Sequence, residues 1–153
     1  MTIGQMAEVI VLGCIPFVSK SLSRRSLLAI GLLAYAGRMA LFAYFQSSAA
    51  MLLLGVALHG LCFGCFIFVA YMIVDEQTSA DVRASAQSLF NLVFVGVGII
   101  VGSMIAGRVA EWATTDDSLD YTKLFSVPMW ASLACLIALM ALYPARSAPS
   151  SQV

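Results

Sequence analysis

Long apolar stretches separated by short polar clusters are the main pattern of this sequence. Three stretches of 36, 24 and 22 residues carry no formal charge, and they lie between Arg38 and Asp75, between Arg83 and Arg108, and between Lys123 and Arg146. A helix needs about 20 apolar residues to cross a hydrocarbon core of roughly 30 Å. The two shorter stretches each fit one helix, whereas the longest exceeds one and contains a polar turn at Gln46.

This pattern predicts an all-α membrane protein with five transmembrane helices, at about residues 2–19, 27–45, 50–74, 84–107 and 124–143. Backbone amides in lipid must bond within their own segment, which requires helices here. A transmembrane β-barrel would need strands of alternating polarity, and residues 52–68 do not alternate. We expect one bundle over residues 1–145 and a disordered cytoplasmic tail at 146–153.

Composition supports a membrane protein and excludes several other classes. Apolar residues make up 61% of the 153 residues, charged residues 10%, and the mean hydropathy is +0.96. A soluble domain has about 25% charged residues, so an ordinary soluble enzyme is excluded, and disordered chains are poor in apolar residues. Eight basic residues against eight acidic ones also exclude a basic nucleic-acid-binding protein.

Basic residues predict the orientation, because cytoplasmic loops of membrane proteins carry an excess of lysine and arginine. Loops 20–26 and 75–83 together with the tail hold five basic residues, and the opposite side holds two. We therefore place those loops and the C-terminus in the cytoplasm of a multi-pass cell-membrane protein, with the N-terminus outside. Five helices in this orientation indicate the end of a longer chain.

Two connections carry further expectations. Thr78 and Asp81 have capping-box spacing, which predicts that a helix restarts there. The connection at 108–123 is longer and acidic, and we interpret it as a solvated loop.

Glycines four residues apart, Gly60 with Gly64 and Gly98 with Gly102, indicate close helix packing.

Glu8 is a carboxyl group within the first predicted span. Ionisable residues inside a membrane are costly and usually functional, so Glu8 is a candidate for proton coupling or substrate binding. The alternative is a residue at the outer membrane surface. Gln5 lies three residues earlier, on the same helix face, and either binds substrate with Glu8 or bonds to another helix.

Arg38 is a second charge within a span. If the first two helices form an antiparallel hairpin that turns near residue 22 or 23, Arg38 and Glu8 lie at nearly equal depth. We expect Arg38 to be a structural buried charge, and an ion pair with Glu8 is possible.

His59, the only histidine, can titrate near neutral pH and is a candidate for a proton pathway. Phe63 follows on the same helix face and can stack on a flat base. The alternatives are a hydrogen-bonded histidine in a helix interior and a phenylalanine in the core or facing lipid. Cys62 and Cys65 do not converge with His59 on one point of a helix, so we expect free thiols and no metal. No catalytic constellation is present, so we expect neither an enzyme nor a cofactor.

Three stretches resemble the C-terminal part of the bacterial nucleoside permeases, the nucleoside:proton symporter family of the major facilitator superfamily. They are Ile3-Gly-Gln-Met-Ala-Glu8 with Ile15-Pro-Phe17, then Arg38-Met-Ala-Leu-Phe-Ala-Tyr44, and then Asp75-Glu through Asp81-Val-Arg-Ala-Ser-Ala-Gln87 to Gly102, Gly107 and Glu111. The resemblance implies that the five helices correspond to helices eight to twelve of a twelve-helix transporter. The N-terminal helices would then be missing partners.

The resemblance also implies a site and a function. Gln5 and Glu8 match family positions that face the nucleoside, and His59 and Phe63 match aromatics of the tenth helix. Gly64 stands where an acidic residue is expected, which places the proton route in question. The implied function is a proton-coupled nucleoside importer working by alternating access. The alternatives are a transporter of another small polar solute and a non-transporting membrane assembly protein.

Overall fold

The computed structural model describes residues 2–18, 22–115 and 118–143. These residues form five continuous helices with short connections between them. Two of the helices are long and contain a central π-helical turn. In chain order the elements are α1 (Thr2–Val18), α2 (Arg24–Tyr44), α3 (Ala49–Cys62), η1 (Phe63–Phe68), α4 (Val69–Gln77), α5 (Arg83–Asn91), η2 (Leu92–Val97), α6 (Gly98–Ala113), β1 (Thr114–Thr115), β2 (Ser118–Leu119) and α7 (Tyr121–Leu142).

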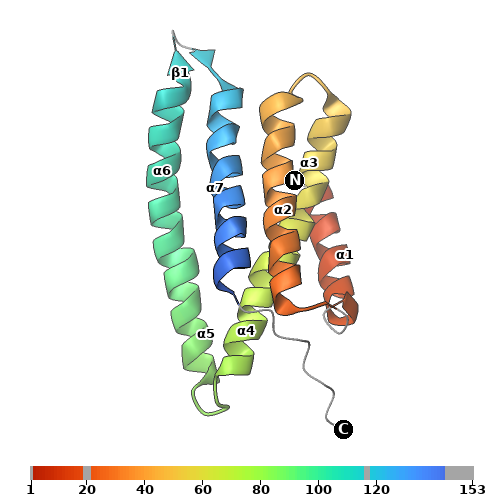
Figure 1. Ribbon diagram of the computed structural model, residues 1–153, viewed down its shortest axis with the longest axis vertical. Helices are drawn as coiled ribbons and strands as arrows, with labels where there is room; N and C mark the ends of the chain where they lie inside the picture. Colours follow the sequence, from red (N-terminus) through yellow and green to blue (C-terminus); the bar gives the residue numbers. More distant parts are fainter. Residues whose placement is uncertain (1, 19–21, 116–117, 144–153) are drawn as a thin grey trace.

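The helices stand side by side in the order α6, α7, α2, α3 and α1 (Figure 1). The helix formed by α3, η1 and α4 is tilted, so its C-terminal half reaches α5 at the lower end of the bundle. Four helices of the described chain are long and apolar enough to cross a membrane, and α1 adds a shorter apolar helix at Gln5–Cys14. The prediction of an all-α membrane protein with five helices is therefore confirmed.

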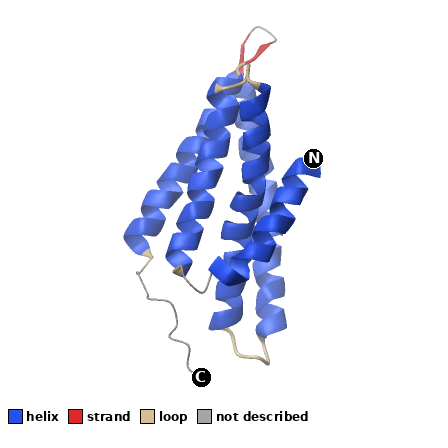
Figure 2. Cartoon of the chain, turned by 90° about the vertical axis from the view of Figure 1, so that its right-hand side faces the viewer, coloured by secondary structure: helices blue, strands red, loops and turns tan. Residues whose placement is uncertain are grey.

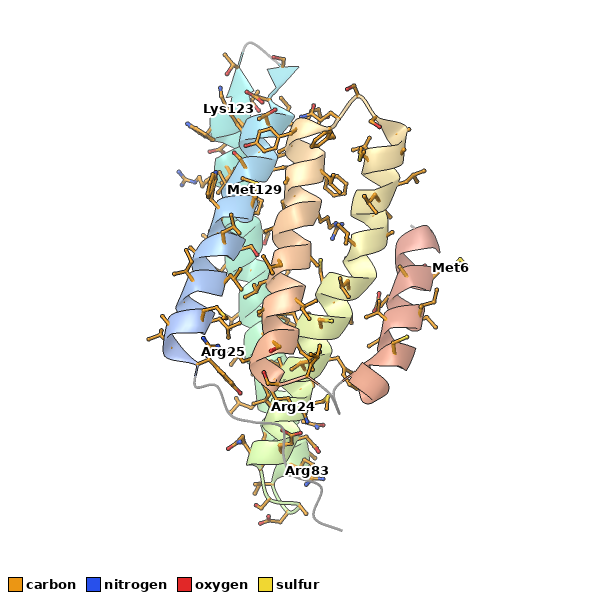
Figure 3. The ribbon with its side chains drawn as sticks, turned by 45° about the vertical axis from the view of Figure 1, so that its right-hand side comes forward. Met6, Arg24, Arg25, Arg83, Lys123 and Met129 are labelled. Carbon is orange, nitrogen blue, oxygen red and sulfur yellow. The ribbon has the colours of Figure 1, made fainter. Side chains whose placement is uncertain are left out.

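The most extensive contact in the bundle is between α2 and α7. Ala36 and Met39 of α2 pack there against Met129 of α7, and Figure 3 shows Met129 beside α2. The hydroxyl of Ser132 also donates a hydrogen bond to the carbonyl oxygen of Leu32, 2.9 Å away. A second apolar cluster centred on Leu27, Leu28 and Val69 joins α2 to α4.

α1 packs against α3 and η1 rather than against α2. Gly60 makes this crossing possible, because a Cβ atom at this position would lie 2.6 Å from the carbonyl oxygen of Ala7. Gly102 and Gly107 on α6, in contrast, face open space, with nothing within 4 Å of an added Cβ. The expectation of close packing holds for Gly60, and at Gly102 nothing lies close enough to pack.

Two of the helices extend past their predicted C-terminal ends, by three residues in α4 and by six in α6. α4 continues to Gln77 and includes Asp75 and Glu76, because Arg24 pairs with Glu76 and Arg83 lies 3.1 Å from Asp75. α6 continues to Ala113, six residues beyond the predicted end. The other three begin or end within about three residues of the prediction.

The expected acidic loop contains two short strands and a helix cap. β1 and β2 pair antiparallel after α6, and Asp120 then caps α7 by accepting hydrogen bonds from the backbone N–H groups of Thr122 and Lys123. A cap of this kind stabilises a helix start by about 1 kcal/mol. Both ends of the range 108–123 are helical, because α6 runs to Ala113 and α7 begins at Tyr121, so the connection is shorter than predicted.

The turn before α5 differs from the predicted capping box. Thr78 donates its hydroxyl hydrogen backward to the carbonyl oxygen of Val74, and the N-cap position of α5 is Val82, which makes no side-chain cap. Asp81 lies in the turn, where a hydrogen bond from the Ser79 side chain holds the pKa of its carboxyl below the usual value. The predicted tail at 146–153 lies outside the described residues.

Charged side chains lie at both ends of the bundle. Figure 3 shows Arg24, Arg25 and Arg83 at one end and Lys123 at the other. The short turns alternate between these ends, as Figure 2 shows for the hairpin at the top and the α4–α5 turn at the bottom. This arrangement fits helices that cross a membrane with their polar connections in water.

Candidate functional site

A cavity of about 430 Å³ lies between α2, the α3–η1 segment and α7. Its size falls within the range of about 300–1,000 Å³ typical of small-molecule sites. Its wall is mostly apolar and includes aromatic rings from three different helices. The lining residues are Gly31, Leu32, Tyr35, Arg38, His59, Cys62, Phe63, Phe66, Ile67, Phe94, Pro128, Ala131, Ser132 and Cys135.

Arg38 and His59 form the polar centre of this cavity. The Nη1 atom of Arg38 lies 2.9 Å from the Nδ1 atom of His59, and both side chains are half-buried. The guanidinium carbon of Arg38 also lies 5.4 Å from the centre of the Phe42 ring, within cation–π range. Arg38 is therefore held by a hydrogen bond from one side and by an aromatic ring from another.

The hydrogen bond fixes the protonation pattern of the histidine. A guanidinium group has only donors, so Nη1 donates and Nδ1 of His59 accepts. The neutral ring then carries its hydrogen on Nε2. Phe63, with its ring centre 6.3 Å from that of His59, lies on the same side of this segment.

Glu8 and Gln5 are not among the side chains that line this cavity. Gln5 is exposed on α1 and Glu8 is half-buried. The ion pair of Glu8 with Arg38 is absent from the described residues, in which Arg38 contacts His59 instead. The reason is that α3 lies between α1 and α2 (Figure 1), so the assumed hairpin of the first two helices does not form.

The four cysteines are free thiols, buried at Cys62 and Cys65 and exposed at Cys14 and Cys135. Within the described ranges, no three His, Cys, Asp or Glu side chains converge as metal ligands would. Gly64 is buried in η1, so the position where the family is expected to have an acid lies inside the bundle.

Sequence reasoning missed several lining residues. Tyr35, Phe94 and Ser132 come from α2, η2 and α7, and nothing in their local sequence marks them as neighbours. The contact between Arg38 and His59 was also missed, although both residues had been singled out. The sequence feature that could have predicted this contact is the short turn at 46–48, which makes α2 and α3 an antiparallel pair.

Fold and cavity thus define a multi-pass membrane protein with a small-molecule-sized cavity among its helices. Residues 1–147 match the profile described as "Nucleoside H+ symporter", and the chain belongs to this family. The family is one of transporters.

Individual relatives agree with this assignment. The chain is 28% identical to nucleoside permease NupG of Escherichia coli (strain K12), over 94% of this chain and 35% of NupG. It is 30% identical to the xanthosine permease of the same organism, over 83% of this chain and 31% of that protein. The crystal structure of nucleoside transporter NupG superposes with a TM-score of 0.86 at 28% identity, over 95% of this chain and 37% of that one. The chain spans about a third of the length of these relatives.

Proposed function

We propose that this chain supplies five helices to a proton-coupled nucleoside importer that works by alternating access. Membership of the nucleoside H+ symporter family carries this proposal, and the cavity with its aromatic wall supports it. The helices would correspond to helices eight to twelve of a major facilitator transporter. The partners are a nucleoside, a proton, the lipid bilayer and N-terminal transporter helices.

The proposed protein lies in the cell membrane with its C-terminus in the cytoplasm. The ends marked by Arg24 and Arg83 would face the cytoplasm, in accord with the excess of basic residues there. The protein moves solutes and is not an enzyme.

Glu8 is the proposed proton-linked carboxyl, and Gln5 and Glu8 both contact the nucleoside. Their side chains lie on α1, where Gln5 is exposed in the described bundle and so free to meet a ligand or another helix. His59 and Phe63 complete the substrate site. His59 can accept a proton only when its hydrogen bond to Arg38 opens. Until then Nδ1 accepts the bond from Arg38 and Nε2 already carries a hydrogen.

Labelled-uridine uptake tests the proposal. Cells would express the longest reading frame that contains this chain, with and without a protonophore, and with Glu8→Gln. We expect uptake that the protonophore abolishes and that Glu8→Gln reduces by at least tenfold, since loss of a proton-transferring group costs about 10²–10⁴-fold in related chemistry.

Each other outcome points elsewhere. A Glu8→Gln variant that retains protonophore-sensitive uptake would place the proton route at another residue. No uptake of any nucleoside, from protein shown to be in the membrane, would favour another solute or a membrane assembly role.

A further inference from the structure

The strongest polar groups of the cavity, Arg38 and His59, both offer hydrogen-bond donors. The guanidinium of Arg38 cannot accept, and its bond to Nδ1 leaves His59 with an N–H at Nε2 as its remaining polar atom. The other polar groups of the cavity distinguish less well between donors and acceptors on a ligand. Ser132 already donates to the Leu32 carbonyl oxygen, and the hydroxyl of Tyr35 can either donate or accept.

No carboxylate of the described residues lies within ion-pair distance of Arg38. The three ion pairs among these residues, Arg24–Glu76, Arg83–Asp75 and Lys123–Asp120, lie at the ends of the bundle. The Nε atom of Arg38 is buried without a hydrogen-bond partner. The part of a ligand that meets Arg38 and His59 must therefore bring acceptors.

We propose that Arg38 is a positioning residue that fixes His59 as a donor to the substrate, so that the site selects bases carrying an oxo group over bases carrying an amino group. This inference rests on the proposed function, in which His59 contacts the nucleoside. An oxo oxygen accepts the hydrogen on Nε2. An amino group at the same position points a hydrogen at a donor, which leaves both donors unpaired.

Without Arg38, His59 would be free to exchange its hydrogen between the two ring nitrogens. With a hydrogen on Nδ1, the Nε2 atom of His59 becomes an acceptor and suits an amino group equally well. Arg38 therefore determines specificity without needing to touch the substrate. A lysine in its place would still donate to Nδ1, because an ammonium group also has only donors.

Uptake of paired nucleosides tests this inference. Inosine and adenosine differ at carbon 6 by oxo against amino, and uridine and cytidine differ in the same way at carbon 4. In each pair the neighbouring ring nitrogen also changes, from a donor N–H to an acceptor, and purine riboside separates the two changes because it has the acceptor nitrogen without the amino group. In cells expressing the longest reading frame, we expect the oxo member of each pair to be preferred by about tenfold or more. Arg38→Met should lower this ratio to within about threefold, and Arg38→Lys should retain it.

Arg108→Gln is the control, because this exposed arginine lies in the C-terminal half of α6, outside the cavity. Its ratios should equal those of the wild type. Equal uptake of both members of each pair by the wild type would overturn the inference. So would an Arg38→Met variant that lowers all four uptakes together, since a purely structural arginine has that effect.

Two further results keep the conclusions separate. If Arg38→Met does not reach the membrane, uptake of purine riboside by the wild type still tests the inference. This nucleoside carries only a hydrogen at carbon 6. Its uptake should fall between those of inosine and adenosine, and any other order overturns the inference. Absence of uptake for all the nucleosides would overturn the proposed function itself.

Discussion

Replacing Gly60 by alanine is expected to destabilise the bundle by about 2–3 kcal/mol or more, because the added methyl group overlaps backbone atoms. The Cβ atom would meet the main chain of Ala7 and Glu8 on α1, which cannot rotate away as a flexible side chain can. The only relief is a separation of α1 from α3. We expect a lower Tm of the purified protein in detergent and less folded protein in the membrane.

Gly13→Ala is the control for this experiment. Gly13 also lies in a helix, on α1, but nothing lies within 4 Å of a Cβ atom added there. Alanine is favoured over glycine in a helix interior by about 0.5–1 kcal/mol, so Gly13→Ala should keep or slightly raise the Tm. Equal tolerance of both substitutions would show that α1 and α3 do not cross closely at Gly60.

The pair of Arg38 and His59 should behave as one unit in a double-mutant cycle. His59→Leu removes the acceptor of a charged donor, and hydrogen bonds to charged groups contribute about 1.5–3 kcal/mol. Arg38→Met removes the charge and leaves a neutral ring nitrogen, which is less costly. The double variant Arg38→Met/His59→Leu places two apolar side chains together, and we expect it to be more stable than His59→Leu alone.

Thermal unfolding of the four proteins measures this coupling. Residues in direct contact typically show interaction energies of about 0.5–3 kcal/mol. If the losses of the two single variants simply add in the double variant, the two side chains do not interact as the structure shows. Phe42→Leu in each background would show how much of the arginine's stabilisation comes from the aromatic ring.

The membrane helices were predictable because charges mark their limits. α1 was expected at 2–19 and runs from Thr2 to Val18. The missed end of α4 depends on partners outside this helix. Asp75 and Glu76 continue a helix because Arg83 and Arg24 meet them, and a pair such as Arg24–Glu76 joins residues 52 positions apart.

The site was predictable only in part, because neighbouring helices cannot be identified from one sequence. Arg38 and His59 stand nine and twelve residues from Ser47, a difference in depth of about 4.5 Å at 1.5 Å per residue, within reach of an arginine side chain. The same depth argument placed Arg38 beside Glu8, and it failed because α1 packs on α3. Depth follows from chain distance, whereas adjacency depends on contacts such as Gly60 against Ala7.

The π-helical turns at Phe63–Phe68 and Leu92–Val97 have a consequence for changes in chain length. Each such turn holds one residue more than an α-helix needs over the same rise. Deleting one residue within either turn can restore a regular helix and leave the faces on both sides aligned. The same deletion in α2 rotates everything beyond it by about 100°. Single-residue gaps in this protein should therefore be tolerated in the middle of its two longest helices, where the walls of the cavity lie.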